Sequence, residues 1–583
     1  MITIFIKSLT IKNFRCFDKE GATIELNDGL TAFIGRNGSG KTAILEALNF
    51  LIGQEYLPIK INEKDFHGTA NDIKDEIFIE AETKSPFFLT LDVRSNTNQL
   101  ETVVIPCNKI RLTIKRREKP EKVLDEPFII NKYVLPVTGE IDESIYEGKE
   151  TARRAIRISQ IKEGYTVFYK LKSGDVRSAK IISYQLNYTP NRLTKCPKSY
   201  YLSKDREDDV SGSYSSLLTK ILTDLHWKYK RERSKKNSNS IEDEYNTLAE
   251  SLRGIVDEKE EIIRQINDKI KSISSSNKDF QIDFIDIEQP YRSAFVAKKE
   301  GEKLLLPEHL GSGFNILIAY ALFAYIADQE KIPIVLIIDE PELHLHSDWQ
   351  KKMYEVFSTQ GNLQIVYSTQ SENLISLKNC KQIRSIADFQ VFPKQEVLQE
   401  NVSATDGVSA TRAEFLDDYA KRNLHISTIL RENLELFFVR KVILAEGPAE
   451  KYGLPKLLKL AGCAIEDKSV AIIPVWGKGK IKIYQMICKV FGIDYFTAFD
   501  NDKATDDEPD GENTAIENNA QDGKYVKFST SFEALLGVSG NNKFQELVKV
   551  IDRLTDINTV DNEIHEAVDA IKDFIENGRT ATD

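Results

Sequence analysis

A glycine-rich octapeptide near the start of the sequence restricts most strongly what this chain can fold into. Residues 35–42 read GRNGSGKT and match the pattern G-x-x-x-x-G-K-[ST]. The octapeptide follows an apolar run, Leu30 to Ile34, and precedes the helical pattern Thr42 to Leu51. A glycine-rich loop between a strand and a helix is the context that a phosphate-binding loop requires. The sequence therefore predicts an α/β nucleotide-binding fold, with a chance match as the alternative.

The residue types in this loop suit the binding of a nucleoside triphosphate. Glycines let backbone N–H groups turn inward around phosphates, a lysine reaches the β and γ oxygens, and a threonine hydroxyl can ligate Mg²⁺. We therefore expect ATP and Mg²⁺ to be bound here. The candidate contacts are Gly35, Asn37, Gly38, Gly40, Lys41 and Thr42, of which Thr42 is also a metal ligand.

Two acidic residues far downstream complete the predicted ATP site. The apolar run Ile334 to Ile338 leads directly into Asp339 and Glu340. A buried strand presents such residues at its end, where Asp339 would hold Mg²⁺ through water and Glu340 would polarise the attacking water. The alternative is an ordinary core strand followed by two exposed acids. Gln370 follows the next predicted strand, where its amide can donate a hydrogen bond but cannot titrate.

Two further segments near these acids are candidates for contacts in the ATP site. Ser312 and Gly313 lie in the segment LGSG, which opens a predicted helix, and the first amides of a helix attract anions. His344 and His346 follow the acidic pair. Residues two apart do not share a helix face, so a loop contact across a dimer is favoured over a metal pair.

Acidic residues also follow two apolar strands in the last third of the chain. Val442 to Ala445 leads into Glu446 and Gly447, and Tyr495 to Phe499 leads into Asp500. Asp502 lies two residues beyond Asp500, and alternate residues of an extended chain point to one side. A third segment, 528–533, ends in Glu533. These three clusters indicate a metal centre, whereas the acids at 506–510 suit a solvated loop.

The turn between the two acidic strands, Trp476 to Lys480, reads WGKGK. Its flexible basic sequence suits contact with a DNA phosphate. A simple connection between a strand and a helix is the other interpretation.

The phosphate-binding loop, the Asp339–Glu340 strand and the LGSG segment resemble the ABC ATPase class, in particular its DNA-repair branch with structural-maintenance and RecF-like proteins. The sequence IKNFR at 11–15 strengthens this resemblance. The resemblance implies that ATP is sandwiched between two heads, with Ser312 and Gly313 of one head completing the site of another. A homodimer or higher homo-oligomer is expected. The class commonly has a histidine where this chain has Gln370.

The Glu446–Gly447 and Asp500-x-Asp502 arrangement resembles the Toprim fold, and the whole chain resembles the OLD (overcoming lysogenization defect) family of ATP-dependent nucleases. The resemblance implies a two-metal site that takes Mg²⁺, with Mn²⁺ or Ca²⁺ as substitutes. It also implies DNA as substrate, Lys543 as a catalytic cation, a role in anti-phage defence, and a helicase-like or other partner as in Gabija-type systems. The implied metal ligands are Glu446, Glu450, Asp500, Asp502 and Glu533.

The predicted fold is therefore an ABC-type P-loop ATPase with an inserted helical arm, followed by a Rossmann-like Toprim α/β domain. We expect the ATPase domain at 1–395, with an insertion at about 200–300 that carries the arm and a dimerisation region. A linker and helix follow at 396–438, and the Toprim domain occupies 439–583.

Composition narrows the function classes. A net charge of −11 argues against a protein that coats nucleic acid through bulk charge, and six scattered cysteines suggest neither disulfides nor zinc. The lack of a long apolar segment predicts a cytoplasmic protein without a membrane contact. An ATP-regulated DNA endonuclease is the leading hypothesis. The alternatives are an ATP-driven DNA clamp or sensor and, less supported, topoisomerase-like strand passage.

Overall fold

The computed structural model describes most of residues 5–203, 333–403 and 433–577, with gaps at 54–60, 69–75, 118–126, 147–152 and 502–510 and a few shorter ones. Short pieces between 264 and 324 and between 409 and 414 are described as well. The chain divides into two compact units, Met1–Phe33 with Gly40–Leu374 and Ile34–Ser39 with Ile375–Asp583. The domain boundaries at 395 and 439 stay predictions. The predicted arm at 241–273 lies outside the described residues, apart from helical positions 264, 268 and 269.

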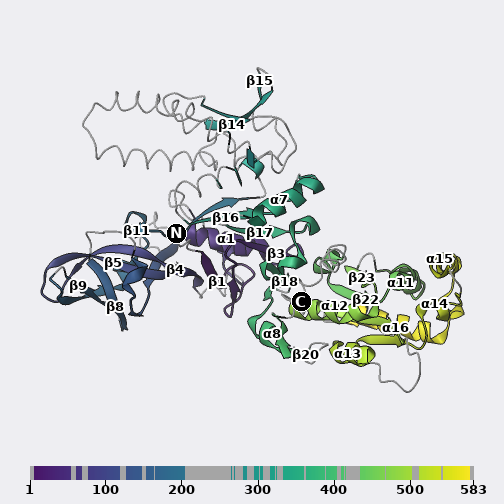
Figure 1. The fold of residues 1–583 in the computed structure, drawn as a ribbon. Coiled ribbons are helices and arrows are strands. Elements are labelled where there is room, and N and C mark those ends of the chain that lie inside the picture. Colours follow the sequence, from purple (N-terminus) through teal and green to yellow (C-terminus); the bar gives the residue numbers. More distant parts are fainter. Residues whose placement is uncertain are drawn as a thin grey trace. The chain divides into compact units, whose positions relative to one another are not determined.

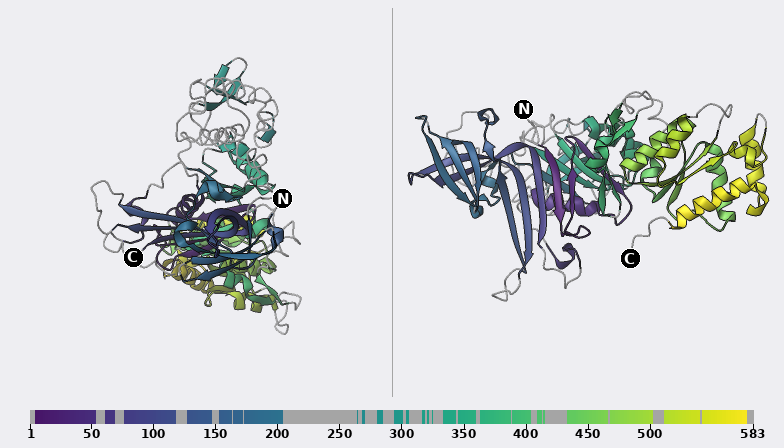
Figure 2. Two further views of the ribbon diagram at one scale, coloured as in Figure 1. Left: turned by 90° about the vertical axis from the view of Figure 1, so that its left-hand side faces the viewer. Right: turned by 90° about the horizontal axis from the view of Figure 1, so that it is seen from below.

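The first unit contains a ten-stranded, mostly antiparallel sheet, drawn in purple and blue in Figures 1 and 2. Its strands alternate buried and more exposed positions, as expected for a sheet with one face on a core. The main path runs β10-β9-β8-β5-β4-β1-β2, and β6, β7 and β11 pair with its members. The strands are β1 (Ile6–Lys12), β2 (Ala22–Glu25), β4 (Ile77–Arg94), β5 (Leu100–Arg116), β6 (Phe128–Pro136), β7 (Gly139–Glu140), β8 (Arg153–Ile161), β9 (Gly164–Lys170), β10 (Val176–Ile182) and β11 (Leu193–Thr194).

A six-stranded sheet carries the nucleotide-site residues, in the order β12-β16-β17-β3-β18-β19. Every residue of its central strands β3, β16 and β17 is buried, as in sheets covered on both faces. The predicted strands and the helix after β3 are confirmed. The elements are β12 (Lys198–Leu202), β16 (Ile334–Asp339), β17 (Leu363–Thr369), β3 (Leu30–Gly35), β18 (Ile383–Ala387) and β19 (Gln390–Phe392), with helices α1 (Lys41–Ile52) and α7 (Ser347–Thr359).

The C-terminal part is built on a four-stranded parallel sheet in the order β23-β22-β24-β25. β22 (Lys441–Ala445) lies in the middle and is buried throughout. It is flanked by β23 (Val470–Pro474) and β24 (Asp494–Asp500), and β25 (Tyr525–Phe528) is at one edge. Because all four strands are parallel, the residues that follow them emerge at one edge of the sheet.

Helices cover both faces of this sheet (Figure 1). One face shares a core with α11, α15 and α16, in which Ile443 and Phe496 meet Leu457 and Ile571. On the other face, buried Gln485 of α12 donates a hydrogen bond to Thr497 of β24. The result is the predicted Rossmann-like α/β layering. The helices are α11 (Pro448–Leu460), α12 (Ile481–Val490), α13 (Gly511–Asn519), α14 (Phe532–Leu535), α15 (Lys543–Arg553) and α16 (Asn562–Asn577).

The chain also contains two small antiparallel sheets. A three-stranded sheet is formed by β13 (Phe280–Phe284), β14 (Ala294–Glu300) and β15 (Lys303–Leu305). The stretch 398–411, which the sequence marks only as a boundary, contains a β-hairpin of β20 (Asn401–Ser403) and β21 (Ser409–Thr411) after helix α8 (Gln395–Gln399). Within the residues described, no helix is both long and apolar enough to cross a bilayer.

Candidate functional site

The glycine-rich loop has the backbone that phosphate binding requires. Gly35, Gly38 and Gly40 have φ of 145°, 80° and 105°. Residues with a Cβ atom rarely adopt such positive φ values. A Cβ on Gly40 would lie 2.8 Å from the Cys16 sulfur, so this position also lacks room for a side chain. Ser39 Oγ is buried without a hydrogen-bond partner in the described residues, which fits a loop that closes around an anion.

Lys41 and Thr42 begin α1 directly after this loop. Lys41 is 5% exposed, and Thr42 Oγ1 donates a hydrogen bond of 3.0 Å to Asp339 Oδ2 at the end of β16. The structure thus brings the two predicted Mg²⁺ ligands of the ATP site together, although they are far apart in the sequence. This pairing fits a magnesium–nucleotide complex.

Ser368, which sequence reasoning missed, links the two acids at the end of β16. Its hydroxyl donates to Asp339 Oδ1 and accepts a 3.0 Å hydrogen bond from the backbone N–H of Glu340. Glu340 has φ of 49°, uncommon for a residue with a side chain, and this N–H contact helps to hold it there. The only sequence signal for Ser368 is its place at the end of the parallel strand next to β16.

Gln370 contacts the predicted water-polarising residue. Its Nε2 donates a 3.0 Å hydrogen bond to Glu340 Oε1, and its backbone N–H donates to Glu342. Thr369 Oγ1 donates to the other oxygen of Glu342, 2.9 Å away. Burial raises the pKa of Glu342, and these hydrogen bonds oppose the rise. Glu342 therefore holds the turn that aims Gln370 at Glu340.

The remaining predicted contacts near the ATP site are Ser312, Gly313, His344 and His346. Ser312, Gly313 and His344 lie outside the described residues. His346 is exposed, and its Nδ1 lies 3.6 Å from a carboxylate oxygen of Asp348.

The C-terminal acids meet at one edge of the parallel sheet. Glu446 directly follows β22, and Asp500 ends the neighbouring strand β24. The backbone N–H of Asp500 donates a 3.1 Å hydrogen bond to Glu446 Oε2, and Asp500 Oδ1 accepts one of 3.1 Å from Phe532. These two hydrogen bonds hold together the end of β22, the end of β24 and the segment at Phe532, around the carboxylates of Glu446 and Asp500.

Glu450 and Asp500 are held in an environment that disfavours their charge. Glu450 is 3% exposed, on the first turn of α11, and its carboxylate accepts a 3.0 Å hydrogen bond from the backbone N–H of Gly447. Burial raises its pKa to about 7, with added repulsion from Glu533 and Glu446. Burial raises the pKa of Asp500 to about 8, with repulsion from Glu450 and Glu446. Two carboxyl groups that ionise near neutral pH mark this edge as a candidate site.

The structure thus places four of the five predicted ligands near one another. Glu533, on α14, is close enough to act on both raised pKa values. Asp502 lies outside the described residues, within which no three acidic, histidine or cysteine side chains converge in ligating geometry. Lys543 opens α15 and is exposed.

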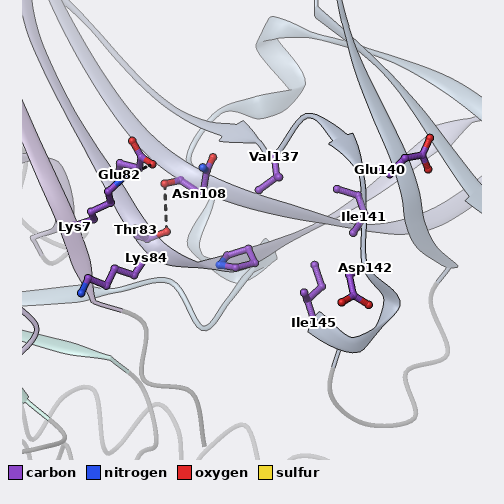
Figure 3. A pocket seen from close by; sticks show the side chains of 11 residues that line it. Lys7, Glu82, Thr83, Lys84, Asn108, Val137, Glu140, Ile141, Asp142 and Ile145 are labelled. Carbon is purple, nitrogen blue, oxygen red and sulfur yellow. Dashed lines mark hydrogen bonds and ion pairs between the residues drawn. The ribbon is translucent and has the colours of Figure 1, made fainter.

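A separate hollow of about 560 Å³ lies on the ten-stranded sheet (Figure 3). Lys7, Glu82 and Thr83 line one side, and Ile141, Asp142 and Ile145 line the other. Thr83 Oγ1 donates to the backbone oxygens of Ser85 and Asn108. The hollow contains none of the residues that the sequence predicts as functional.

Comparison with protein families places the ATP-site residues and the C-terminal carboxylates in two different domains. Residues 5–375 match the family model of the AAA ATPase domain, and residues 437–502 match that of the overcoming lysogenization defect protein-like TOPRIM domain. Among solved structures, the Smc head domain of Pyrococcus furiosus bound to the C-terminal domain of ScpA is 15% identical with a TM-score of 0.35. The alignment covers 72% of this chain and 99% of that one.

The chain is also similar to curated proteins, over nearly all of its length or over part of it. An OLD nuclease of Thermus scotoductus is 23% identical, with 99% of each chain covered. Endonuclease GajA of Bacillus cereus is 24% identical over 77% of this chain and 67% of its own length. The DNA replication and repair protein RecF of Streptococcus gordonii is 37% identical over 38% of this chain and 63% of its own. The chain belongs to the AAA ATPase domain family through residues 5–375 and joins to that domain a TOPRIM domain of the overcoming lysogenization defect type.

Proposed function

We propose that this protein is an ATP-binding, divalent-metal-dependent DNA endonuclease whose nucleotide state regulates cleavage. The observation that carries the proposal is the carboxylate cluster of Glu446, Glu450 and Asp500 at the carboxyl edge of the C-terminal sheet. Similarity along nearly the whole chain to a protein named OLD nuclease, and to endonuclease GajA over most of it, supports a nuclease.

The residues of the cluster fit a hard divalent cation. Every donor is a carboxylate oxygen, the ligand type that Mg²⁺ and Mn²⁺ prefer. The raised pKa values of Glu450 and Asp500 come from burial and mutual repulsion, which a nearby positive charge would offset. We assign Glu446, Glu450, Asp500 and Glu533 as ligands, with Asp502 as a fifth, and two bound Mg²⁺ ions would supply water activation and charge stabilisation at the leaving oxygen.

The chain's own residues orient these ligands. Backbone N–H groups of Gly447, Asp500 and Phe532 each donate to one carboxylate, so each carboxylate keeps one defined orientation. Lys543, at the start of α15, is proposed as the cation that approaches the substrate phosphate.

In the ATP site, Lys41 would bind the terminal phosphates, and Thr42 and Asp339, which are hydrogen-bonded to each other, would hold Mg²⁺. Glu340 orients the attacking water, and its hydrogen bond with Gln370 couples it to the end of β17. Assembly through paired heads, with Ser312 and Gly313 supplied by a second copy, is part of this proposal. A role in anti-phage defence and a separate partner protein stay predictions from the resemblance.

The proposed function is tested with supercoiled plasmid and purified full-length protein in Mg²⁺, Mn²⁺ or EDTA. We expect nicked or linear product in either metal, none in EDTA, and a loss of about 100-fold or more in Glu446→Gln because a ligand is removed. Glu566→Gln, which changes an exposed acid on α16, is the matched control and should cut normally. Equal cutting by Glu446→Gln would refute the assignment, and intact plasmid in every lane would favour the clamp.

A further inference from the structure

The loop after β23 presents an aromatic side chain to solvent in an unusual backbone conformation. Trp476 is 49% exposed and has φ of 58°, and Gly477 follows with φ of 118°. A bulky residue with positive φ is a rare outlier that costs roughly 1 kcal/mol or more. An indole that is half exposed buries only about half of its surface, so packing alone does not account for a tryptophan at this strained position.

This loop is fastened to the carboxylate cluster. Pro474 at the end of β23 is in register with Ala445 at the end of β22, and the N–H of Val475 donates to the Ala445 carbonyl over 2.9 Å. The N–H of Gly477 then donates a 3.0 Å hydrogen bond to the carbonyl of Glu446. Neighbouring strands lie about 4.8 Å apart. Trp476 is therefore held about one strand spacing from a predicted metal ligand.

Three lysines follow Trp476 along the chain. Lys478 Nζ lies 5.9 Å from the ring centroid of Phe499, the residue before Asp500, and Lys480 and Lys482 follow on η9 (Lys478–Lys480) and α12. A cluster of carboxylates repels a phosphodiester backbone, and lysines beside it offset that repulsion. An exposed aromatic ring beside lysines is the combination that binds single-stranded nucleic acid, since every base has a face that can stack.

We propose that Trp476 is a stacking platform for an unpaired DNA base, with Lys480 contacting a neighbouring phosphate. The inference rests on the proposed function and specifies its substrate as single-stranded or locally opened DNA. A base stacked on the indole would place the adjoining backbone within reach of Glu446 and Asp500. Because a paired base offers no free face within a duplex, intact duplex gains nothing from this contact.

The platform is tested by fluorescence anisotropy with a dye-labelled 20-nucleotide single strand and with its duplex. All proteins carry Asp500→Asn in Mg²⁺, so that the DNA stays intact. Trp476→Gly should lower affinity for the single strand by about tenfold or more, whereas Trp476→Phe should retain most of it. Affinity for the duplex should change less than threefold. Unchanged single-strand affinity in Trp476→Gly, or an equal loss for both DNAs, would overturn the proposal.

A matched variant separates binding from folding. Phe389 is also an aromatic residue, 47% exposed with φ of 60°, so Phe389→Gly removes a similar ring from a similar backbone. Glycine adopts positive φ without strain, which offsets part of the burial that each ring loses, and both variants should show a folded thermal transition of similar midpoint. Single-strand affinity should stay unchanged in Phe389→Gly. A loss there as large as in Trp476→Gly would contradict a specific role for Trp476.

The outcomes also distinguish the platform from the nuclease. If the unaltered protein cuts plasmid but Trp476→Gly binds single strands normally, the platform is wrong and the nuclease stands. If single-strand binding depends on Trp476 but no metal yields cutting, the platform stands as part of a DNA-binding protein that does not cleave.

Discussion

At Asp500, burial and neighbouring carboxylates raise the pKa from 3.8 to about 8. An unfolded chain releases this proton near pH 4, whereas the folded protein keeps it until about pH 8. Between these values the folded state binds one more proton, so its stability falls as pH rises through this window. Metal-free protein should therefore melt at lower temperature at pH 9 than at pH 6, and metal should remove part of the difference.

Asp500→Asn should remove most of this pH dependence. We expect the variant, in EDTA at pH 9, to melt about 2 °C or more above the unaltered protein, because a buried charge is gone. Differential scanning fluorimetry at pH 6 and pH 9 measures both effects, with Glu566→Gln as the control. Identical melting curves for Asp500→Asn and the parent at pH 9 would show that the carboxylate is not under repulsion.

Lys41→Ala should weaken ATP binding by about tenfold or more, because the variant loses the buried ammonium that we propose binds the terminal phosphates. Isothermal titration with a non-hydrolysable ATP analogue gives the affinity directly. Lys64→Ala, at an exposed position on the 3-10 helix Glu63–Asp65, serves as the control. If Lys41→Ala and Lys64→Ala bind the ATP analogue with equal affinity, Lys41 does not contribute to nucleotide binding.

At the scale of elements, Ser368 couples β17 to the two acids that end β16. Ser368→Ala removes the hydroxyl that donates to buried Asp339 Oδ1, whereas the Glu340 N–H keeps the Ser368 carbonyl as a partner, so we expect a cost of about 1 kcal/mol in the free energy of unfolding. It should also slow ATP hydrolysis, since Asp339 and Glu340 lose their shared support. Urea unfolding and phosphate release measure the two effects, with Ser358→Ala on the exposed face of α7 as control. Full stability and full hydrolysis in Ser368→Ala would contradict this coupling.

The strands that carry both sites could be predicted from the sequence because buried parallel strands are continuous apolar runs, as in β16, β22 and β24. Asp339, Glu446 and Asp500 could be predicted as candidate site residues because each is an acid directly after such a run. The contacts of Ser368 and Glu342 could not be predicted, because they depend on the register between strands far apart in sequence. The positive φ of Trp476 could not be predicted either, because it does not change the pattern of apolar and polar residues. The glycine that follows, Gly477, is the one sequence feature that suggests an unusual turn.

At the scale of the whole molecule, the predicted ATP site and the carboxylate cluster of the predicted nuclease site belong to different parts of the chain. The ATP residues lie within the AAA match at 5–375, and Glu446, Glu450 and Asp500 lie within the TOPRIM match at 437–502. Each site should therefore survive loss of the other's principal residue. Regulation of cleavage by ATP would then act between two separate sites.

The most direct test measures both properties on the same preparations of the parent, Lys41→Ala and Asp500→Ala. ATP-analogue affinity and Mn²⁺-dependent plasmid cleavage are recorded for each, the latter with and without ATP. We predict that Asp500→Ala binds nucleotide as the parent does but no longer cuts. Lys41→Ala should bind nucleotide weakly and cut at a rate that no longer responds to ATP. Normal cutting by Asp500→Ala, or loss of its nucleotide binding, would contradict the account.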